Sequence, residues 1–300
     1  MTTHKTRRLL IIGATGQVGG DVVRTLAKQA DIETLAAVRR VDQAEDMRTL
    51  GAEPIHLDLD DMETVEKAVQ GVDGLLLMAG YSVDMLKQSK RVIDAAKRAG
   101  VDHIVHIGTS GADTAEVAHW GWHRMIEAYV EDQGFRFTHI RPEGFMQNVL
   151  TFGWLQRGAL TNLIGDARWS WVDARDVAAL AAAALADPDT FGGQVWRLGY
   201  DAGTIADVAG KISDYVGHSI EIAPLDPQVF YDGAVGAGAD PAYMACIRDQ
   251  FRLNAEGAIP NADETFDAAA FERTVGRPPA SWADYIARDG AALTTAAAQE

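Results

Sequence analysis

Cysteine, cationic residues and long apolar runs are all scarce in this chain of 300 residues. The single cysteine, Cys246, cannot form an internal disulfide or a cysteine-rich zinc site, which is typical of proteins in a reducing compartment. Lysine and arginine number 27 against 43 aspartate and glutamate residues, and the formal net charge of −16 argues against a general nucleic-acid-binding surface. An anionic ligand must therefore be bound at a specific local site.

No segment of the sequence is apolar enough to suggest a membrane protein. The longest apolar run, from Val177 to Ala186, is about half of the ~20 residues that a transmembrane helix needs. The first residues carry cations but no following apolar core with a cleavage site, so we expect no signal peptide. These absences predict a cytoplasmic protein with neither a membrane nor a nucleic-acid partner.

Short apolar runs alternate with helical patterns through the first two-thirds of the chain. Near-continuous apolar strands separated by helices predict an α/β fold with a doubly wound parallel sheet of the Rossmann type. The expected strands are 9–12, 34–38, 54–59, 74–78, 101–107, 135–140 and 194–198. The expected helices include 43–50, 62–69, 82–99, 120–132 and 175–186.

A glycine-rich loop directly follows the first expected strand and opens an amphipathic helix. Its missing Cβ atoms let the backbone turn tightly and approach a pyrophosphate, which then lies on the N–H groups of the helix N-terminus. This context predicts a dinucleotide-binding site, and a tight turn without a ligand is the alternative. The loop residues are Gly13, Ala14, Thr15, Gly16, Gln17, Val18 and Gly19.

The residues after the second strand select between NAD and NADP. An acidic residue there would hold the ribose 2′-hydroxyl and repel a 2′-phosphate. This chain has Arg39 and Arg40 instead, and arginine forks suit a phosphate, so the sequence predicts NADP(H); two solvated arginines without a ligand are the alternative. Ligands bind at the carboxyl ends of parallel strands. The cofactor is therefore expected to contact Asp58, Leu59, Met78, Ala79 and Gly80 as well.

The regular alternation of expected strands and helices stops after Pro142, where aromatic residues lie among glycines. We expect residues 1–148, completed by 173–200, to form the NAD(P)-binding domain. Residues 149–172 and 201–300 would form a smaller substrate-binding lobe. The last hundred residues show no regular pattern, and the Gly-Ala-rich segment 233–239 is the best candidate for a mobile segment.

The usual catalytic pair of short-chain reductases is absent. The Gly-x-x-Gly-x-x-Gly spacing resembles the short-chain dehydrogenase/reductase superfamily, in which a Ser after the fifth strand precedes a Tyr-x-x-x-Lys helix. Thr109 and Ser110 follow the fifth strand here, but His123 and Glu127 stand at the Tyr and Lys places. An imidazole can exchange a proton near neutrality, and Glu127 lies one helical turn away to orient it. We therefore predict His123, Ser110 and Thr109 as catalytic residues.

A packed structural histidine is the alternative for His123, and His119 is a weaker candidate for the same role. The pair of histidines four residues apart could suggest a metal. The zinc-protease pattern needs Glu directly after the first histidine, however, and Trp120 stands there. No cluster of further ligands accompanies the pair, so we expect no metal site.

Two segments, Trp122 to Glu127 and Phe137 to Asn148, resemble the NmrA-like family of atypical reductases. Those proteins show a Lys or His, a Glu four residues on, and then a Thr-x-x-Arg-Pro…Phe-x-x-Asn stretch. The resemblance continues through residues 172–178 and 193–198 and covers about residues 7–225. The family includes NADPH-dependent quinone and azo-compound reductases, benzylic ether reductases, and redox sensors that bind the dinucleotide without evident turnover. The resemblance therefore implies the fold and the cofactor better than the reaction.

The loop after the sixth strand is expected to reach the nicotinamide end of the cofactor through Pro142, Gly144 and Phe145. Aromatic residues could wall a flat apolar pocket beside it, although aromatics at such spacings are often simple core. The candidates for this pocket are Tyr81, Trp120, Phe145, Phe152 and Trp154. His103 and His106 lie on opposite faces of the fifth strand, where buried and hydrogen-bonded side chains are expected.

These patterns together predict an NADPH-dependent oxidoreductase that transfers a hydride to a small aromatic electrophile, such as a quinone, an azo compound or an activated carbonyl. Two alternatives stay open. One is a regulatory protein that senses NADP(H) without turnover, and the other is an NADPH-dependent ether or imine reductase. The sequence does not determine the oligomeric state, and a homodimer is one option.

Overall fold

The chain folds into two compact units. The computed structural model describes residues 6–78, 80–111, 116–259 and 266–298. Unit 1 comprises Met1–Thr109, Gly121–Arg141 and Val177–Trp196. Unit 2 comprises Ser110–Trp120, Pro142–Asp176 and Arg197–Glu300.

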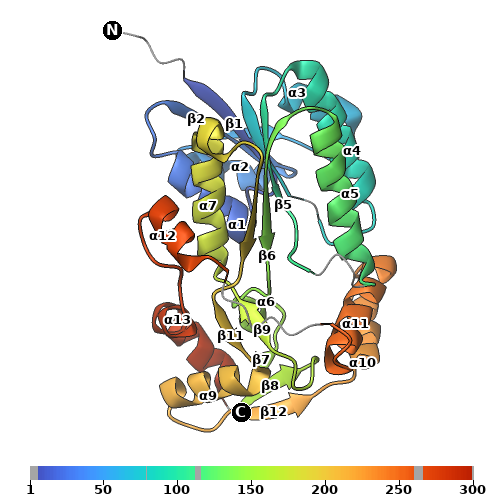
Figure 1. Ribbon diagram of the computed structural model, residues 1–300, viewed down its shortest axis with the longest axis vertical. Helices are drawn as coiled ribbons and strands as arrows, with labels where there is room; N and C mark the ends of the chain where they lie inside the picture. Colours follow the sequence, from blue (N-terminus) through green and yellow to red (C-terminus); the bar gives the residue numbers. More distant parts are fainter. Residues whose placement is uncertain (1–5, 79, 112–115, 260–265, 299–300) are drawn as a thin grey trace. The chain divides into compact units, whose positions relative to one another are not determined.

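A seven-stranded sheet forms the centre of unit 1, in the order β10-β6-β5-β4-β1-β2-β3 (Figure 1). The pairings that join β1 to β6 are all parallel. The strand order reverses at β1, which is the doubly wound Rossmann arrangement, so the predicted fold class is confirmed. The strands are β1 (Arg7–Ile11), β2 (Ile32–Val38), β3 (Glu53–His56), β4 (Gly74–Leu77), β5 (His103–Ile107), β6 (Arg136–Pro142) and β10 (Gln194–Leu198).

Helices cover both faces of this sheet, with α1 and α7 on one side and α3, α4 and α5 on the other (Figure 1). Their apolar faces are buried against the sheet, whose inner strands β4 and β5 are buried along their whole length, as parallel sheets require. Gly100 ends α4 in the left-handed conformation that glycine adopts without strain. The bounds are α1 (Gln17–Leu26), η1 (Val41–Gln43), α2 (Ala44–Thr49), α3 (Met62–Ala68), α4 (Met85–Ala99), α5 (Ala118–Asp132), α7 (Ala174–Ala186) and α8 (Pro188–Phe191).

Unit 2 combines two small sheets with helices around a tryptophan-rich core. Strands β9 (Trp169–Trp171) and β11 (Asp201–Gly203) are antiparallel, and β8 (Ala159–Asn162) lies between β12 (Glu221–Pro224) and β7 (Leu155–Gln156). The core includes Trp154, Trp169, Trp171 and Trp282. The helices are α6 (Asn148–Thr151), α9 (Ile205–Val216), α10 (Pro227–Gly236), α11 (Pro241–Ala255), α12 (Ala268–Val275) and α13 (Trp282–Ala297).

The prediction of an irregular last hundred residues is wrong, because α9 to α13 occupy most of it. Two Asp-Pro pairs explain part of the difference, for α10 and α11. Asp226 and Asp240 cap the helices that begin at Pro227 and Pro241, and each carboxylate accepts a hydrogen bond from a backbone N–H of the first turn. Proline at the first helical position loses no hydrogen bond, so these two prolines start helices rather than end them. Helix α10 also includes the start of the Gly-Ala-rich segment 233–239.

None of the helices in the described ranges has the length and apolar character needed to cross a lipid bilayer.

Candidate functional site

A backbone hydrogen bond closes the loop between β1 and α1. Gly13 has a φ of +80°, which glycine adopts without strain, and its carbonyl accepts a hydrogen bond from the Gly16 N–H at 3.0 Å. Gly16 is the N-cap of α1 and provides no side-chain cap, and the first turn carries no acidic residue. This helix end therefore presents backbone N–H groups and a positive dipole without a competing carboxylate in its first turn.

Gly19 lets α1 pack directly against the loop. A Cβ atom at this position would lie 2.1 Å from the carbonyl oxygen of Gly13 and 2.6 Å from its carbonyl carbon. Thr15, Gly16 and Gln17 are exposed at the tip of the loop, whereas Ala14 and Val18 are buried beneath it. The geometry fits the pyrophosphate of a dinucleotide, which would lie on the N–H groups of α1.

The carboxyl ends of β1, β2, β3 and β4 meet at one edge of the sheet, because these strands are parallel neighbours. Arg39 and Arg40 follow β2, and both are exposed. The Nε of Arg40 lies 3.1 Å from an oxygen of Asp42. The Arg39 side chain makes no hydrogen bond or ion pair with any residue in the described ranges, so its guanidinium is available to a phosphate.

The other predicted cofactor contacts lie after β3 and β4. Asp58 is half-buried, and its carboxylate accepts a hydrogen bond from the Asp60 N–H at 2.9 Å. Met78 packs over the glycine loop, since a Cβ atom on Gly13 would be 3.4 Å from the Met78 side chain. Leu59 is half-buried, Gly80 is exposed, and Ala79 lies outside the described residues.

Helix α5 connects β5 to β6 and packs His123 and Glu127 toward these two strands. Both oxygens of Glu127 accept hydrogen bonds from the Arg141 guanidinium of β6, at 3.1 and 2.5 Å, and Arg124 adds a third at 2.9 Å. Only 3% of the Glu127 side chain is exposed. Arg124 also donates to the backbone carbonyl of Thr109, at 3.0 Å, so the ion pairs join α5 and β6 to the end of β5.

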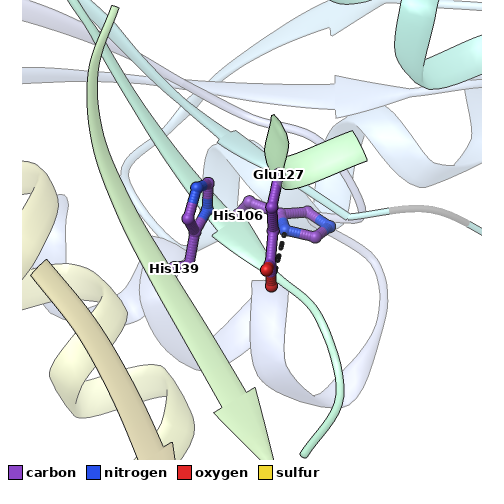
Figure 2. A group of neighbouring side chains, drawn as sticks. All are labelled: His106, Glu127 and His139. Carbon is purple, nitrogen blue, oxygen red and sulfur yellow. Dashed lines mark ion pairs between the residues drawn. The ribbon is translucent and has the colours of Figure 1, made fainter. Parts of the chain in front are cut away.

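Two histidines lie beside this carboxylate on adjacent strands. His106 of β5 and His139 of β6 are register partners, and neither side chain is exposed. Figure 2 shows the carboxylate of Glu127 beside the ring of His106, whose Nδ1 is 3.9 Å from the nearer oxygen. The Nε2 of His106 is hydrogen-bonded to the Nδ1 of His123, at 3.3 Å. His123 is 9% exposed and is the outermost ring of the three.

The histidines within the sheet are neutral. Burial lowers the pKa of His139 to about 3, and the cations Arg141 and Arg124 act in the same direction. The half-exposed carboxylate of Glu131, 3.3 Å away, does not offset this burial. Burial also holds the pKa of His106 well below its usual value, with His123 and His139 as the next causes. Burial lowers the pKa of His103 to about 4, and its Nε2 is hydrogen-bonded to Thr138 at 3.0 Å.

The ligand atoms of His106, Glu127 and His139 lie within 4.8 Å of one another, which is close enough to consider a metal ion. Neutral imidazoles and a carboxylate are suitable ligands. The carboxylate, however, already has both oxygens bound to guanidinium groups. These two cations oppose the approach of a divalent ion, so the donor set fits a proton-handling cluster better than a metal site.

Sequence reasoning treated His106 as a core residue and did not connect it with His123, His139 or the two arginines. The missing information was the register of β5 against β6, which places residues 33 positions apart on one face. The sequence does contain one relevant signal, which is the predicted connection of two parallel strands, β5 and β6, by the helix α5. A helix that joins two adjacent parallel strands must pack on them, so polar residues of β5, α5 and β6 meet.

Unit 2 holds the predicted catalytic residue Ser110, which is 1% exposed. Its hydroxyl accepts a hydrogen bond from the Nε of Arg197 at 3.1 Å, and its backbone N–H donates to the carbonyl of Pro142. Burial raises the pKa of the neighbouring Glu143, although a hydrogen bond with Ser110 and the charge of Arg197 oppose the shift. Ser110 is thus part of a polar group with Glu143 and Arg197 that the sequence did not indicate.

The predicted aromatic residues differ widely in exposure. Tyr81 and Phe152 are 66% and 47% exposed, and Phe145 is half-buried. Trp154 packs in the core of unit 2, and Trp120 covers Gly111, where a Cβ atom would lie 2.4 Å from the indole. His119 is buried beside Tyr243, with ring centroids 5.6 Å apart, and burial lowers its pKa to about 4. Gly144 is packed against Trp169 in a similar way.

The profile of the NmrA-like family matches residues 5–274. The chain belongs to the NmrA-like family. An NAD(P)H azoreductase of Xenophilus azovorans is 26% identical to this NmrA-like protein over 291 residues, covering 96% of this chain and 100% of the relative. Quinone oxidoreductase 2 of Escherichia coli is 25% identical over 283 residues, covering 93% and 97% of the two chains.

Solved structures agree with the observed fold. A structure of the Escherichia coli NADPH-dependent quinone oxidoreductase complexed with NADPH superimposes with a TM-score of 0.78 at 25% identity, and covers 93% of this chain and 99% of that chain. The transcriptional regulator NmrA, solved in complex with NADP, superimposes with a TM-score of 0.72 at 16% identity, over 94% of each chain. The second likeness shows the fold alone.

Gly19→Ala is expected to open the β1–α1 loop, because the new Cβ would overlap the carbonyl group of Gly13. Overpacking of this kind costs about 1–3 kcal/mol of stability, and we expect the affinity for NADPH to fall at least about tenfold. Urea unfolding and titration of NADPH fluorescence measure the two effects.

Gly20→Ala is the matched control in the same helix. Its Cβ would lie 3.4 Å from the nearest atom, an ordinary contact, and alanine is favoured over glycine inside a helix by up to about 1 kcal/mol. Equal NADPH affinities for the two variants would contradict the role given to Gly19.

The neutral histidines predict a loss of stability in mild acid. Below the ordinary value of 6.5 the unfolded chain binds a proton at His139, whereas the folded chain does not until about pH 3. Each such histidine lowers the free energy of unfolding by about 1.4 kcal/mol per pH unit within this window. His139→Leu should reduce that slope by the same amount in urea unfolding at several pH values. An unchanged slope would show that His139 is protonated in the folded protein.

Proposed function

We propose that this NmrA-like protein is an NADPH-dependent reductase of small aromatic electrophiles such as quinones or azo compounds. The observation that carries the proposal is the β1–α1 loop, in which Gly19 packs on Gly13 and the end of α1 is left open to an anion. Relatives that match almost the whole chain support it, since an NAD(P)H azoreductase and a quinone oxidoreductase are among them.

The preference for NADPH over NADH rests on Arg39. This side chain is exposed after β2, at the sheet edge where a dinucleotide places its adenosine ribose. No acidic residue directly follows β2 to bind the 2′-hydroxyl, and Arg40 is already paired with Asp42. A charge-assisted hydrogen bond from Arg39 to the 2′-phosphate is the expected contact.

His123 is the proposed proton donor. When bound, NADPH supplies a hydride, that is, one hydrogen nucleus with two electrons. A quinone that accepts the hydride needs one proton to become the hydroquinone, and the imidazolium of His123 supplies it. The ring then regains a proton from solvent. Thr109 and Ser110 are the further candidates for a catalytic role, and Tyr81, Phe145 and Phe152 are candidates for substrate contact.

The central test is consumption of NADPH by the purified protein with a panel of quinones and azo dyes. His123→Ala should lower kcat by about 100-fold, the usual contribution of a general acid, while the affinity for NADPH is retained. His218→Ala, in the second unit, is the control and should keep the wild-type kcat. Tight binding of NADPH without turnover of any acceptor would favour the alternative of a dinucleotide-sensing protein.

Arg39→Ala tests the choice of cofactor separately. Loss of one charge-assisted contact to the 2′-phosphate should weaken NADPH binding by about tenfold or more and leave NADH binding nearly unchanged. Arg40→Ala should have the smaller effect, because that guanidinium is paired with Asp42. Equal losses of NADPH and NADH affinity in Arg39→Ala would contradict the assignment.

A further inference from the structure

His106 is a buried histidine whose ring is directly bonded to the proposed proton donor. Its Nε2 lies 3.3 Å from the Nδ1 of His123, and the ring centroids are 5.3 Å apart at an angle of 38°. One of the two nitrogens must donate and the other must accept. The direction of this hydrogen bond decides which nitrogen of His123 carries the proton that a substrate could take.

Glu127 determines the direction. Its nearer oxygen is 3.9 Å from the Nδ1 of His106, as Figure 2 shows, so the negative charge favours a proton on that nitrogen. This distance is too long for a hydrogen bond, and Nδ1 of His106 has no hydrogen-bond partner in the described part of the chain. With Nδ1 protonated in a neutral ring, the Nε2 of His106 carries a lone pair and accepts from the Nδ1–H of His123.

Neutrality of His106 is maintained by its surroundings. Burial and the neighbouring histidines hold its pKa well below the usual value, and the charges of Arg124 and Arg141 act in the same direction. The same arginines bind both oxygens of Glu127, so that carboxylate does not take up the proton of His106. The groups that face the pair are therefore Glu127 and Arg124 on α5, and His139 and Arg141 on β6.

Gly108 leaves the space in which these groups face one another. A Cβ atom on Gly108 would lie 3.0 Å from the nearer Glu127 oxygen and 3.2 Å from Cε1 of His106. Both contacts are tighter than most real Cβ contacts, so an alanine here would push Glu127 or His106 by a few tenths of an ångström. The absence of a side chain at Gly108 therefore lets the carboxylate and the ring lie this close together.

We propose that His106 is a positioning residue, whose neutral ring accepts a hydrogen bond from Nδ1 of His123 and thereby makes Nε2 of His123 the proton-donating atom. The inference rests on the proposed function, in which His123 protonates the reduced acceptor. The acceptor bond stabilises the protonated ring of His123, because a hydrogen bond from a charged donor is stronger than one from a neutral donor.

The kinetic test compares His106→Leu with His106→Gln. Leucine removes the acceptor, so kcat at neutral pH should fall about tenfold, and the pH at which activity falls to half should decrease by about one unit. Glutamine can present its amide oxygen near the position of Nε2 and should restore most of kcat and of the pH profile. KM for NADPH should stay constant in both variants.

His103→Leu is the matched control, since His103 is equally buried on the same strand and its ring bonds Thr138 instead. Its kcat and pH profile should equal those of the wild type even if its stability falls. Wild-type kcat and pH profile in His106→Leu would overturn the inference, as would equal losses in His106→Leu and His106→Gln with both variants folded by circular dichroism.

A second measurement keeps the inference testable if no acceptor is reduced. Nitrogen-15 spectra of histidine-labelled protein at neutral pH report which ring nitrogen of each residue is protonated. We expect a proton on Nδ1 and a lone pair on Nε2 for His106, and a proton on Nδ1 for His123. A proton on Nε2 of His106 would overturn the inference. Absence of NADPH turnover, with the expected spectra, would overturn only the proposed function.

Discussion

The ion pair between Glu127 and two arginines is the interaction on which the proposed chemistry depends. Arg141 belongs to β6, Glu127 and Arg124 belong to α5, and Arg124 also binds the carbonyl of Thr109 after β5. Leaving a carboxylate with 3% exposure unpaired would cost about 3–5 kcal/mol, so these elements are tightly joined. Burial is the main reason that the nearby histidines stay neutral, and the two cations around this one anion act in the same direction.

Much of the candidate cofactor site could be predicted because it depends on local sequence. A strand, a glycine turn and a helix are adjacent in the chain, and β1 to β4 are found within a few residues of their predicted bounds. The rule that ligands bind at the carboxyl ends of parallel strands then selects Arg39, Asp58 and Met78 without further information. The second unit was less predictable. Two of its helices start at Asp-Pro pairs, Asp226-Pro227 and Asp240-Pro241, and such pairs are also typical of turns.

The cluster of Glu127, His106 and His123 could be predicted only in part, because it depends on strand register. Spacing from the fifth strand identifies His123 and Glu127 as replacements for a Tyr and Lys pair. It also suggests that Glu127 orients His123, since the two are one turn apart. The structure shows both oxygens of Glu127 bound to arginines, and places His106 between the carboxylate and His123. That arrangement follows from the pairing of β5 with β6, which no local pattern reveals.

The proposed reaction has two parts, cofactor binding and proton donation, and each places a different requirement on the sequence. The glycine loop acts through backbone N–H groups and close packing, so Gly19 is required whatever the substrate. The proposed proton donor is one side chain on α5, His123, so a substitution at this position need not alter the sheet. A chain with a net charge of −16 can serve both parts because the cations that each part needs are close by, Arg39 for the cofactor and Arg124 and Arg141 around Glu127. In the proposed reaction, local charge and burial, rather than net charge, therefore decide which anion binds and which histidine carries a proton.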